Sequence, residues 1–128
     1  MNPKTFLKLG GTILVLVGIL GMVNILGPTE NDSIFGPSWW FDDAENWAHL
    51  VLGIIALLAA FVLPAGMQRG LVMLLGIVGV LIGLYSLFGK TEFYGANLEN
   101  PADSVLHLIV GIWALWASMK KQNVMMGA

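Results

Sequence analysis

The sequence has no cysteine and very little charge. Without cysteine it has no disulfides, no thiolate metal ligands and no thiol nucleophile. With 6 basic and 8 acidic residues and a net charge of -2, it has no excess of basic residues for binding nucleic acid. Charged residues make up 11% of the chain, against about 25% in ordinary soluble domains. Because 57% of the residues are hydrophobic, we expect the chain to lie in a lipid bilayer.

Recognisable catalytic motifs are also missing. The sequence contains no serine in a nucleophile elbow, no phosphate-binding loop and no dinucleotide fingerprint. We therefore expect that the protein is not an enzyme.

Four uncharged runs separate the few charges. They cover residues 9–29, 46–68, 70–89 and 104–119. A spanning helix needs about 20 mostly apolar residues, so the pattern predicts an all-α integral membrane four-helix bundle, a single domain over residues 1–128. A signal peptide would end at a small-residue cleavage site, but the first run continues to Leu26 without one, so we interpret it as a retained helix.

The charges are divided unevenly between the two sides of the predicted bundle. All eight acids lie in or beside the first-to-second and third-to-fourth connections. Five of the six bases lie in the two terminal tails and the second-to-third turn. By the positive-inside rule, this bias predicts that both termini are cytoplasmic. Aromatic residues typical of a membrane boundary gather on the acidic side: Phe35, Trp39, Trp40, Phe41, Trp47, Phe93 and Tyr94.

Two segments of the sequence resemble each other. Residues 44–57 and 102–115 are identical at seven of 14 positions, at an offset of 58. The helices that precede them agree at an offset of 62, which pairs Gly21 with Gly83. We therefore expect two tandem helix-loop-helix repeats, about residues 5–63 and 70–119, that run in the same sense through the membrane.

The second and fourth helices are expected to begin with similar caps. Asp42 and Asn100 are the predicted N-caps, and Pro101 occupies the favoured first helical position. Glu45 and Asp103 then take the acidic N3 position of a capping box. Capping therefore accounts for both acids.

The two histidines, His49 and His107, occur once in each repeat, at the same predicted depth. Ionisable groups in apolar helices usually face a bundle interior or a cavity. In one interpretation the imidazoles only hydrogen-bond to a loop carbonyl or capping acid, and no cofactor binds. In another they hold a haem, a chlorin or another tetrapyrrole, with Gly53 and Gly111 giving the flat ring access to the backbone.

A divalent metal is a further alternative. Glu45 and Asp103 each precede a histidine by four residues, so each acid and its histidine share a helix face and could complete a two-histidine, two-carboxylate site. Asn24 and Ser86, at the outer ends of the first and third helices, are predicted hydrogen-bond partners of the histidines.

Glycine is frequent in the first and third helices. Gly79 and Gly83 match the four-residue spacing of close helix packing. Ion paths commonly require a charged residue in the middle of a span, and none of the four spans has one. We therefore expect a structural or accessory role, in a homo-oligomer or a larger membrane complex joined through glycine-rich faces. A small-solute transporter or channel is a further hypothesis, suggested by the repeat alone.

The pattern Asn46-x-x-His49-x-x-x-Gly53, with glycine-rich odd-numbered helices, resembles an uncharacterised four-helix family of prokaryotic membrane proteins, a domain of unknown function. The resemblance covers most of the chain. It implies a four-span fold in a prokaryotic cytoplasmic membrane and no established activity. In the second copy Ser104 takes the place of Asn46.

Overall fold

The chain is helical along most of its length in the computed structural model, which describes residues 1–89, 92–93, 96–97 and 102–120. Its α-helices are α1 (Pro3–Met22), α2 (Asp43–Val62), α3 (Ala65–Phe88) and α4 (Ala102–Ser118). Two 3₁₀ turns, η1 (Glu30–Asp32) and η2 (Gly36–Ser38), lie between α1 and α2. A two-residue antiparallel ribbon, β1 (Glu92–Phe93) and β2 (Ala96–Asn97), lies between α3 and α4. The helical class predicted from the sequence is confirmed.

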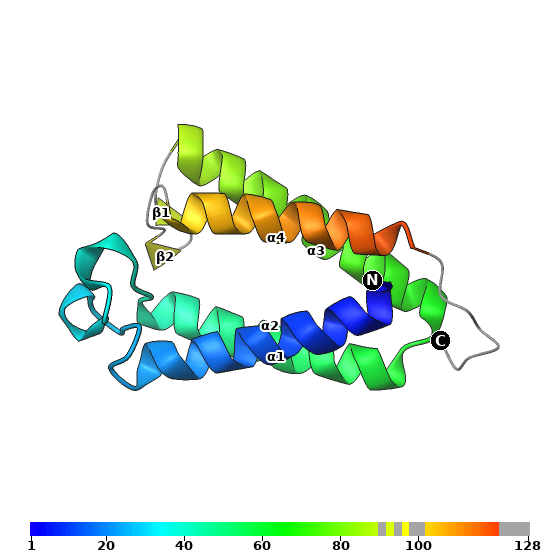
Figure 1. Cartoon of the computed structure of the whole chain (residues 1–128), viewed down its shortest axis with the longest axis horizontal. Helices are drawn as coiled ribbons and strands as arrows, with labels where there is room; N and C mark the ends of the chain where they lie inside the picture. The colour runs from blue at the N-terminus through cyan, green and yellow to red at the C-terminus, as the bar shows by residue number, and fades with distance from the viewer. Residues whose placement is uncertain (90–91, 94–95, 98–101, 121–128) are drawn as a thin grey trace.

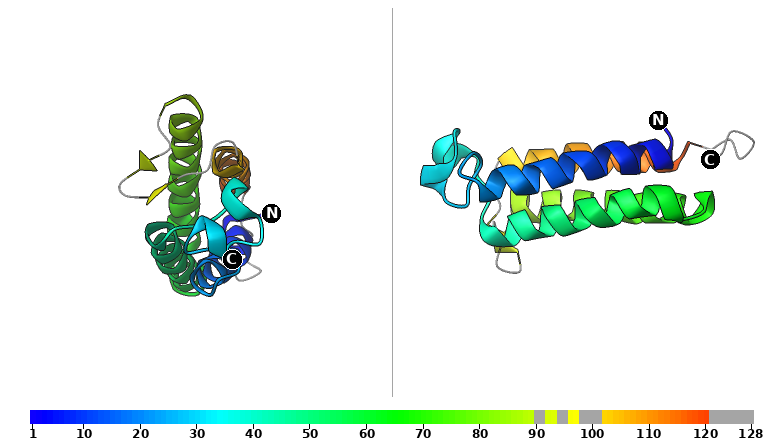
Figure 2. Two further views of the ribbon diagram at one scale, coloured as in Figure 1. Left: turned by 90° about the vertical axis from the view of Figure 1, so that its left-hand side faces the viewer. Right: turned by 90° about the horizontal axis from the view of Figure 1, so that it is seen from below.

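The helices form two antiparallel pairs. α1 packs along α2 and α3 packs along α4, and both pairs extend along the length of the molecule (Figure 1). Viewed along the helices, the first hairpin and the second hairpin lie beside each other (Figure 2). We call the end that carries residues 23–42 and the β ribbon the loop end. The opposite end, which holds Met1 and the α2–α3 turn, is the terminal end.

Three helices, α1, α2 and α3, are long and apolar enough to cross a membrane. The fourth predicted span is shorter, because α4 begins at Ala102 and has 17 residues. At about 1.5 Å per residue such a helix is roughly 26 Å long, slightly less than the roughly 30 Å of a hydrocarbon core.

Helix boundaries differ from those expected at two places. α1 ends at Met22 rather than continuing to Leu26, since the chain turns at Asn24, whose φ is 65°. α2 ends at Val62 and α3 begins directly after Pro64, so Arg69, expected in the second-to-third turn, lies in α3 instead. Proline lacks a backbone N–H and disfavours helical geometry in the residue before it, which explains the early break.

Gln68 joins these two helices at the terminal end. Its buried side-chain Nε2 donates to the carbonyl oxygens of Ala59 and Ala60, at 3.2 and 3.0 Å. The Ala59 carbonyl also accepts from the backbone N–H of Leu63, whereas the last carbonyls of a helix have no partner within that helix. The Gln68 amide therefore completes the end of α2 from the start of α3.

The apolar core also lies toward the terminal end, and all four helices contribute to it. Its buried members are Phe6, Leu7, Ala56, Ala59, Ala60, Val72, Ala114 and Ala117. The ring of Phe6 meets Trp113 edge-on, with 4.7 Å between ring centroids. Because most of these side chains are small, the helices approach closely here and hold the two hairpins together.

Within the first hairpin, glycine allows backbone to meet backbone. A Cβ on Gly53 would lie 2.8 Å from the carbonyl oxygen of Gly11 and 2.8 Å from the backbone nitrogen of Val15. One on Gly18 would lie 2.9 Å from the carbonyl oxygen of Asn46. Any larger residue at these positions would push α1 and α2 apart.

The second hairpin repeats these contacts. A Cβ on Gly111 would lie 2.9 Å from the carbonyl oxygen of Gly76 and 2.7 Å from the nitrogen of Val80, and one on Gly83 would lie 2.9 Å from the carbonyl oxygen of Ser104. Gly76, Val80 and Gly83 thus correspond to residues 65 positions earlier in α1, rather than 62 as expected. A three-residue shift is close to one helical turn and nearly preserves the face, so the sequence alone does not distinguish the two offsets.

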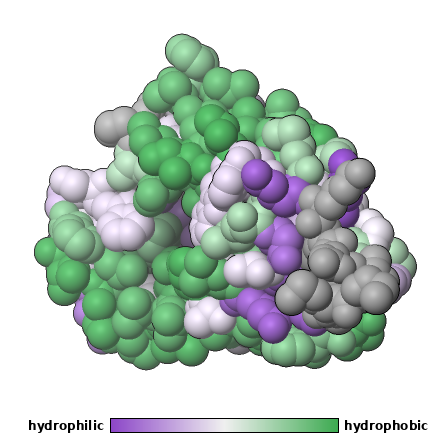
Figure 3. Space-filling view, turned by 45° about the vertical axis from the view of Figure 1, so that its right-hand side comes forward, coloured by the Kyte–Doolittle hydropathy of each residue, from purple (hydrophilic) through white to green (hydrophobic). Residues whose placement is uncertain are grey.

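Large apolar side chains face outward from every α-helix. Leu16 on α1, Leu58 on α2, Leu81 on α3 and Ile112 on α4 are all exposed. Apolar residues dominate the surface in Figure 3, and hydrophilic side chains gather toward the terminal end. An apolar surface of this extent, with polar side chains buried inside, is unusual for a water-soluble chain and suits a membrane protein.

Candidate functional site: a buried polar cluster at the loop end

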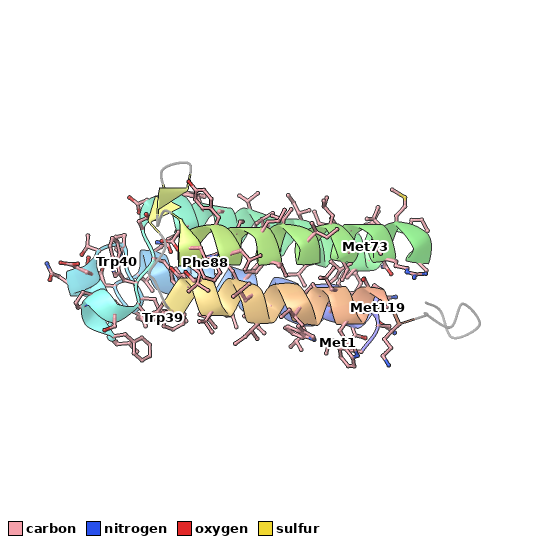
Figure 4. All side chains as sticks on the ribbon, turned by 90° about the horizontal axis from the view of Figure 1, so that it is seen from above. Met1, Trp39, Trp40, Met73, Phe88 and Met119 are labelled. Atoms are coloured by element: carbon pink, nitrogen blue, oxygen red, sulfur yellow. The ribbon has the colours of Figure 1, made fainter. Side chains whose placement is uncertain are left out.

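The loop after α1 folds back over the starts of α2 and α4. Backbone bonds from Phe41 to Leu26, at 2.7 Å, and from Ile34 to Ile25, at 2.9 Å, fix its course. Two of its own side chains, Leu26 and Phe41, are buried. Trp39 and Trp40 lie at this end of the molecule, far from Met1 (Figure 4). Phe41 lies on the predicted side of the molecule, but its ring is buried inside the loop end.

Aromatic rings connect the loop to the first histidine. Trp39 meets Phe41 edge-on at 5.2 Å between centroids, and Phe41 meets His49 edge-on at 5.1 Å. The Trp39 indole Nε1 also donates to Asp103 Oδ1 at 2.9 Å. A loop of the first hairpin therefore holds the first turn of α4 in the second.

The predicted capping box at the start of α2 is confirmed. Asp42 Oδ1 accepts from the backbone nitrogen of Glu45 at 2.9 Å, and Glu45 Oε1 accepts from the backbone nitrogen of Asp42 at 3.3 Å. Glu45 is nevertheless only 4% exposed, and its second carboxyl oxygen, Oε2, has no hydrogen-bond partner. The corresponding cap of α4, at Asn100 and Pro101, lies outside the described residues.

Asn46 and Ser104 occupy matching positions, one turn before the histidines, and both are fully buried. The Asn46 side chain packs directly against Gly21, where a Cβ would collide with its amide, and its Nδ2 donates to the Phe41 carbonyl oxygen at 3.4 Å. In the second hairpin the hydroxyls of Ser104 and Ser86 are hydrogen-bonded at 2.7 Å. A large side chain facing glycine thus has its counterpart in two small side chains facing each other.

The two histidines lie at matching positions of α2 and α4, but their surroundings differ. Nδ1 of His107 lies 2.7 Å from the carbonyl oxygen of Asp103. Since a carbonyl oxygen only accepts, Nδ1 carries the proton and donates. Nδ1 of His49 is buried and has no hydrogen-bond partner.

One of the two expected neighbours of the histidines lies elsewhere. Asn24 is exposed beyond the end of α1 and takes no part in the buried cluster. Ser86, on α3, is buried beside Ser104, which lies on α4 one helical turn before His107. The pairing of Asn24 with Ser86 fails because the contacts align Ser86 with Gly21.

Gly53 and Gly111 do not offer a flat ring access to the backbone in this structure. The backbone of α1, at Gly11, fills the space beside Gly53, and the backbone of α3, at Gly76, fills the space beside Gly111. Both glycines act in helix packing.

The four candidate metal ligands do not form one ligand set. Among the residues that the structure describes, no group of three or more His, Asp or Glu side chains is arranged to hold a metal ion. Two of the four have other contacts, as Glu45 belongs to the α2 cap and Asp103 accepts from Trp39.

Sequence reasoning found the histidines and the capping acids, but it missed Trp39 and the full burial of Asn46 as parts of the same cluster. Asn46 carried a signal, because a polar residue at an early turn of an apolar helix usually faces inward. The Trp39 contact spans 64 positions, and no local pattern encodes it.

Comparison with known proteins adds no relative. No protein-family model matches the chain, and no match was found among curated proteins or solved structures. The resemblance to a four-helix prokaryotic membrane family stays a prediction.

Proposed function

We propose that this chain is a multi-pass membrane protein with a structural or accessory role and no catalytic activity. The supporting observation is its inverted surface: large apolar side chains face outward on all four α-helices, while Glu45, Asn46 and Asp103 are buried between them. Such a surface suits contact with lipid and with other membrane helices. We include α4 as a fourth, shorter span of the bundle.

Two tandem repeats are part of the proposal. The helix contacts recur at an offset of 65 between α1 and α3 and of 58 between α2 and α4. The contacting glycines of the first repeat, Gly11 and Gly53, are therefore seven residues further apart in the chain than Gly76 and Gly111 of the second. The sequence offsets of 62 and 58 predicted a difference of four. The additional residues belong to the loop that contributes Trp39 to the cluster.

The proposed orientation puts the terminal end in the cytoplasm. Lys8 and Lys120 lie at this end, each over an exposed aromatic ring: Lys8 Nζ is 5.1 Å from the centroid of Phe61 and Lys120 Nζ is 5.2 Å from that of Trp116. Basic and aromatic side chains are typical of the cytoplasmic membrane boundary. Arg69, in the first turns of α3, lies on the same side.

The surface proposed for association differs from the one expected. Gly79 and Gly83 pack against α4 and are not available to a partner. Gly66 and Gly70, also four residues apart, have no atom within 4 Å of their Cβ positions. A second copy or another membrane helix can approach α3 closely along this face.

Paired-histidine binding is the second candidate function. The buried, unpartnered Nδ1 of His49 favours it, because a neutral imidazole nitrogen without a partner is free to accept or to ligate. A haem or another tetrapyrrole at this place would need the packing around Gly53 and Gly111 to open.

The decisive experiment is to purify the full chain from its native membrane into lipid nanodiscs and to measure its assembly and absorption spectrum. We expect a colourless preparation that assembles with itself or with a membrane partner. Replacing both Gly66 and Gly70 by leucine should weaken that assembly at least tenfold, because the added side chains keep a neighbouring helix away. The matched control, Ile77→Leu with Leu81→Ile, changes exposed residues of the same helix and should assemble normally.

Two results would count against the proposal. A monomer without any partner, unchanged by the glycine substitutions, removes the accessory role. A visible absorption band that disappears in His49→Gln supports the histidine site instead.

A further inference from the structure

Two carboxyl groups meet inside the loop end, one from each hairpin. Glu45, on the first turn of α2, is 4% exposed, and Asp103, on the first turn of α4, is 1% exposed. They are close enough for their charges to repel each other, and Asp42 adds a third acid beside Glu45. Like charges in a desolvated site strongly disfavour the doubly ionised state.

The hydrogen bonds around the pair leave one oxygen of Glu45 unused. Glu45 Oε1 accepts from the backbone of Asp42, and Asp103 Oδ1 accepts from the Trp39 indole. Glu45 Oε2 is buried without a hydrogen-bond partner. An ionised oxygen in this position would be costly, whereas a protonated one could donate toward the neighbouring carboxylate.

We propose that Glu45 and Asp103 form a proton-binding site that joins the two hairpins. One proton, taken up from water, is covalently held on Glu45 Oε2 and hydrogen-bonded toward the Asp103 carboxylate. The pair then carries one negative charge instead of two. This inference does not depend on the proposed accessory role, since it concerns the interior of a single chain.

The surroundings favour a proton over a small cation. A calcium ion requires about six to eight oxygen ligands, while a shared proton needs one donor and one acceptor. Among the described residues, Asp42, the N-cap of α2, also acts on Glu45, and His49, one turn further along α2, lies near Asp42 and His107. α1 and α3 face the matching turns with Gly21 and Ser86, which do not titrate.

Infrared spectroscopy of the full chain in phosphatidylcholine nanodiscs tests the site directly. We expect a protonated-carboxyl C=O band that persists at neutral pH and shifts when glutamate is ¹³C-labelled at its side-chain carboxyl. Glu45→Gln should abolish the band, because the amide replaces the acid and still accepts from Asp42. Glu30→Gln, which removes an exposed acid in η1, should leave it unchanged.

Thermal unfolding gives a second measurement on the same samples. As the pH is raised from neutral, loss of the shared proton should lower the melting temperature of the wild type, while Glu45→Gln should lose far less. Absence of the band in the wild type, or a band that neither labelling nor Glu45→Gln moves, would overturn the proposal. So would a wild-type melting temperature that rises with sodium or calcium chloride but not with choline chloride, because the site would then hold a cation.

Discussion

The two hairpins use the same backbone contacts but different side chains to fill the space between their helices. In the first, Asn46 packs against Gly21; in the second, Ser104 is hydrogen-bonded to Ser86. A large side chain facing a glycine in the first hairpin thus occupies the space that two serine side chains occupy in the second. The two hairpins therefore share their helix spacing, and side chains of compensating size fill the space between the helices.

The hairpins differ more at their histidines. His107 donates to the carbonyl of Asp103 on its own helix, whereas His49 lies against the Phe41 ring with a buried Nδ1 that has no partner. The long loop of the first hairpin supplies that ring. The first hairpin therefore has an unsatisfied polar group in its interior where the second has a satisfied one.

The largest expected effect comes from breaking the contact that both hairpins share. Gly53→Ala and Gly111→Ala should each cost about 3 kcal/mol of unfolding free energy, because the new methyl group meets the backbone of the facing helix. Gly70→Ala, with open space around it, should be neutral or stabilising by up to about 1 kcal/mol. Unfolding in mixed micelles, followed by circular dichroism, measures all three. Strongly unequal losses for Gly53 and Gly111 would show that the hairpins are not equivalent.

A smaller effect should come from replacing the side chains that fill the space between α1 and α2 with those that fill the space between α3 and α4. Gly21→Ser alone should cost about 2 kcal/mol, because its side chain collides with the Asn46 amide. Adding Asn46→Ser recreates the serine pair of the second hairpin and should recover about 1 kcal/mol in a double-mutant cycle. Additive losses in the same unfolding assay would mean that the two positions are independent.

The smallest of the three effects should follow from separating the hairpins at the loop end. Trp39→Phe keeps an aromatic ring but removes the donor to Asp103, which should cost about 1.5 kcal/mol for a hydrogen bond to a charged group. Hydrogen exchange should then accelerate at the start of α4 more than at the start of α2. Trp47→Phe, at a 60% exposed position, is the control and should change neither. Equal losses for both tryptophans would contradict a specific role for Trp39.

Much of the fold could be predicted because it follows from local patterns. Apolar runs of spanning length gave the helices, and the acid-rich start of α2 gave its capping box. The errors arose where two segments meet. Pro64 ended α2 earlier than the uncharged run suggested. The offset predicted between α1 and α3 differed by about one helical turn from the offset of their contacts, because glycine and valine repeat on nearly the same helical face.

The candidate site was only partly predictable for a similar reason. The sequence pointed to His49, His107, Glu45 and Asp103 as polar groups in an apolar chain. It did not show that Gly53 and Gly111 face the backbone of neighbouring helices, since a small residue is equally compatible with helix packing and with cofactor access. Nor did it distinguish an acid that caps a helix from one that also faces a second carboxyl group.

The sequence by itself determined the helical class of this protein and predicted both a membrane location and the sides on which its charges lie, because these depend on composition and on order along the chain. Only the tertiary structure decided which groups meet: Asn46 with Gly21, Ser86 with Ser104, Trp39 with Asp103. The burial of Glu45 beside Asp103 is of the same kind. It depends on two first turns, 58 residues apart in the chain, being brought together at one end of the bundle, and local sequence does not encode that distance.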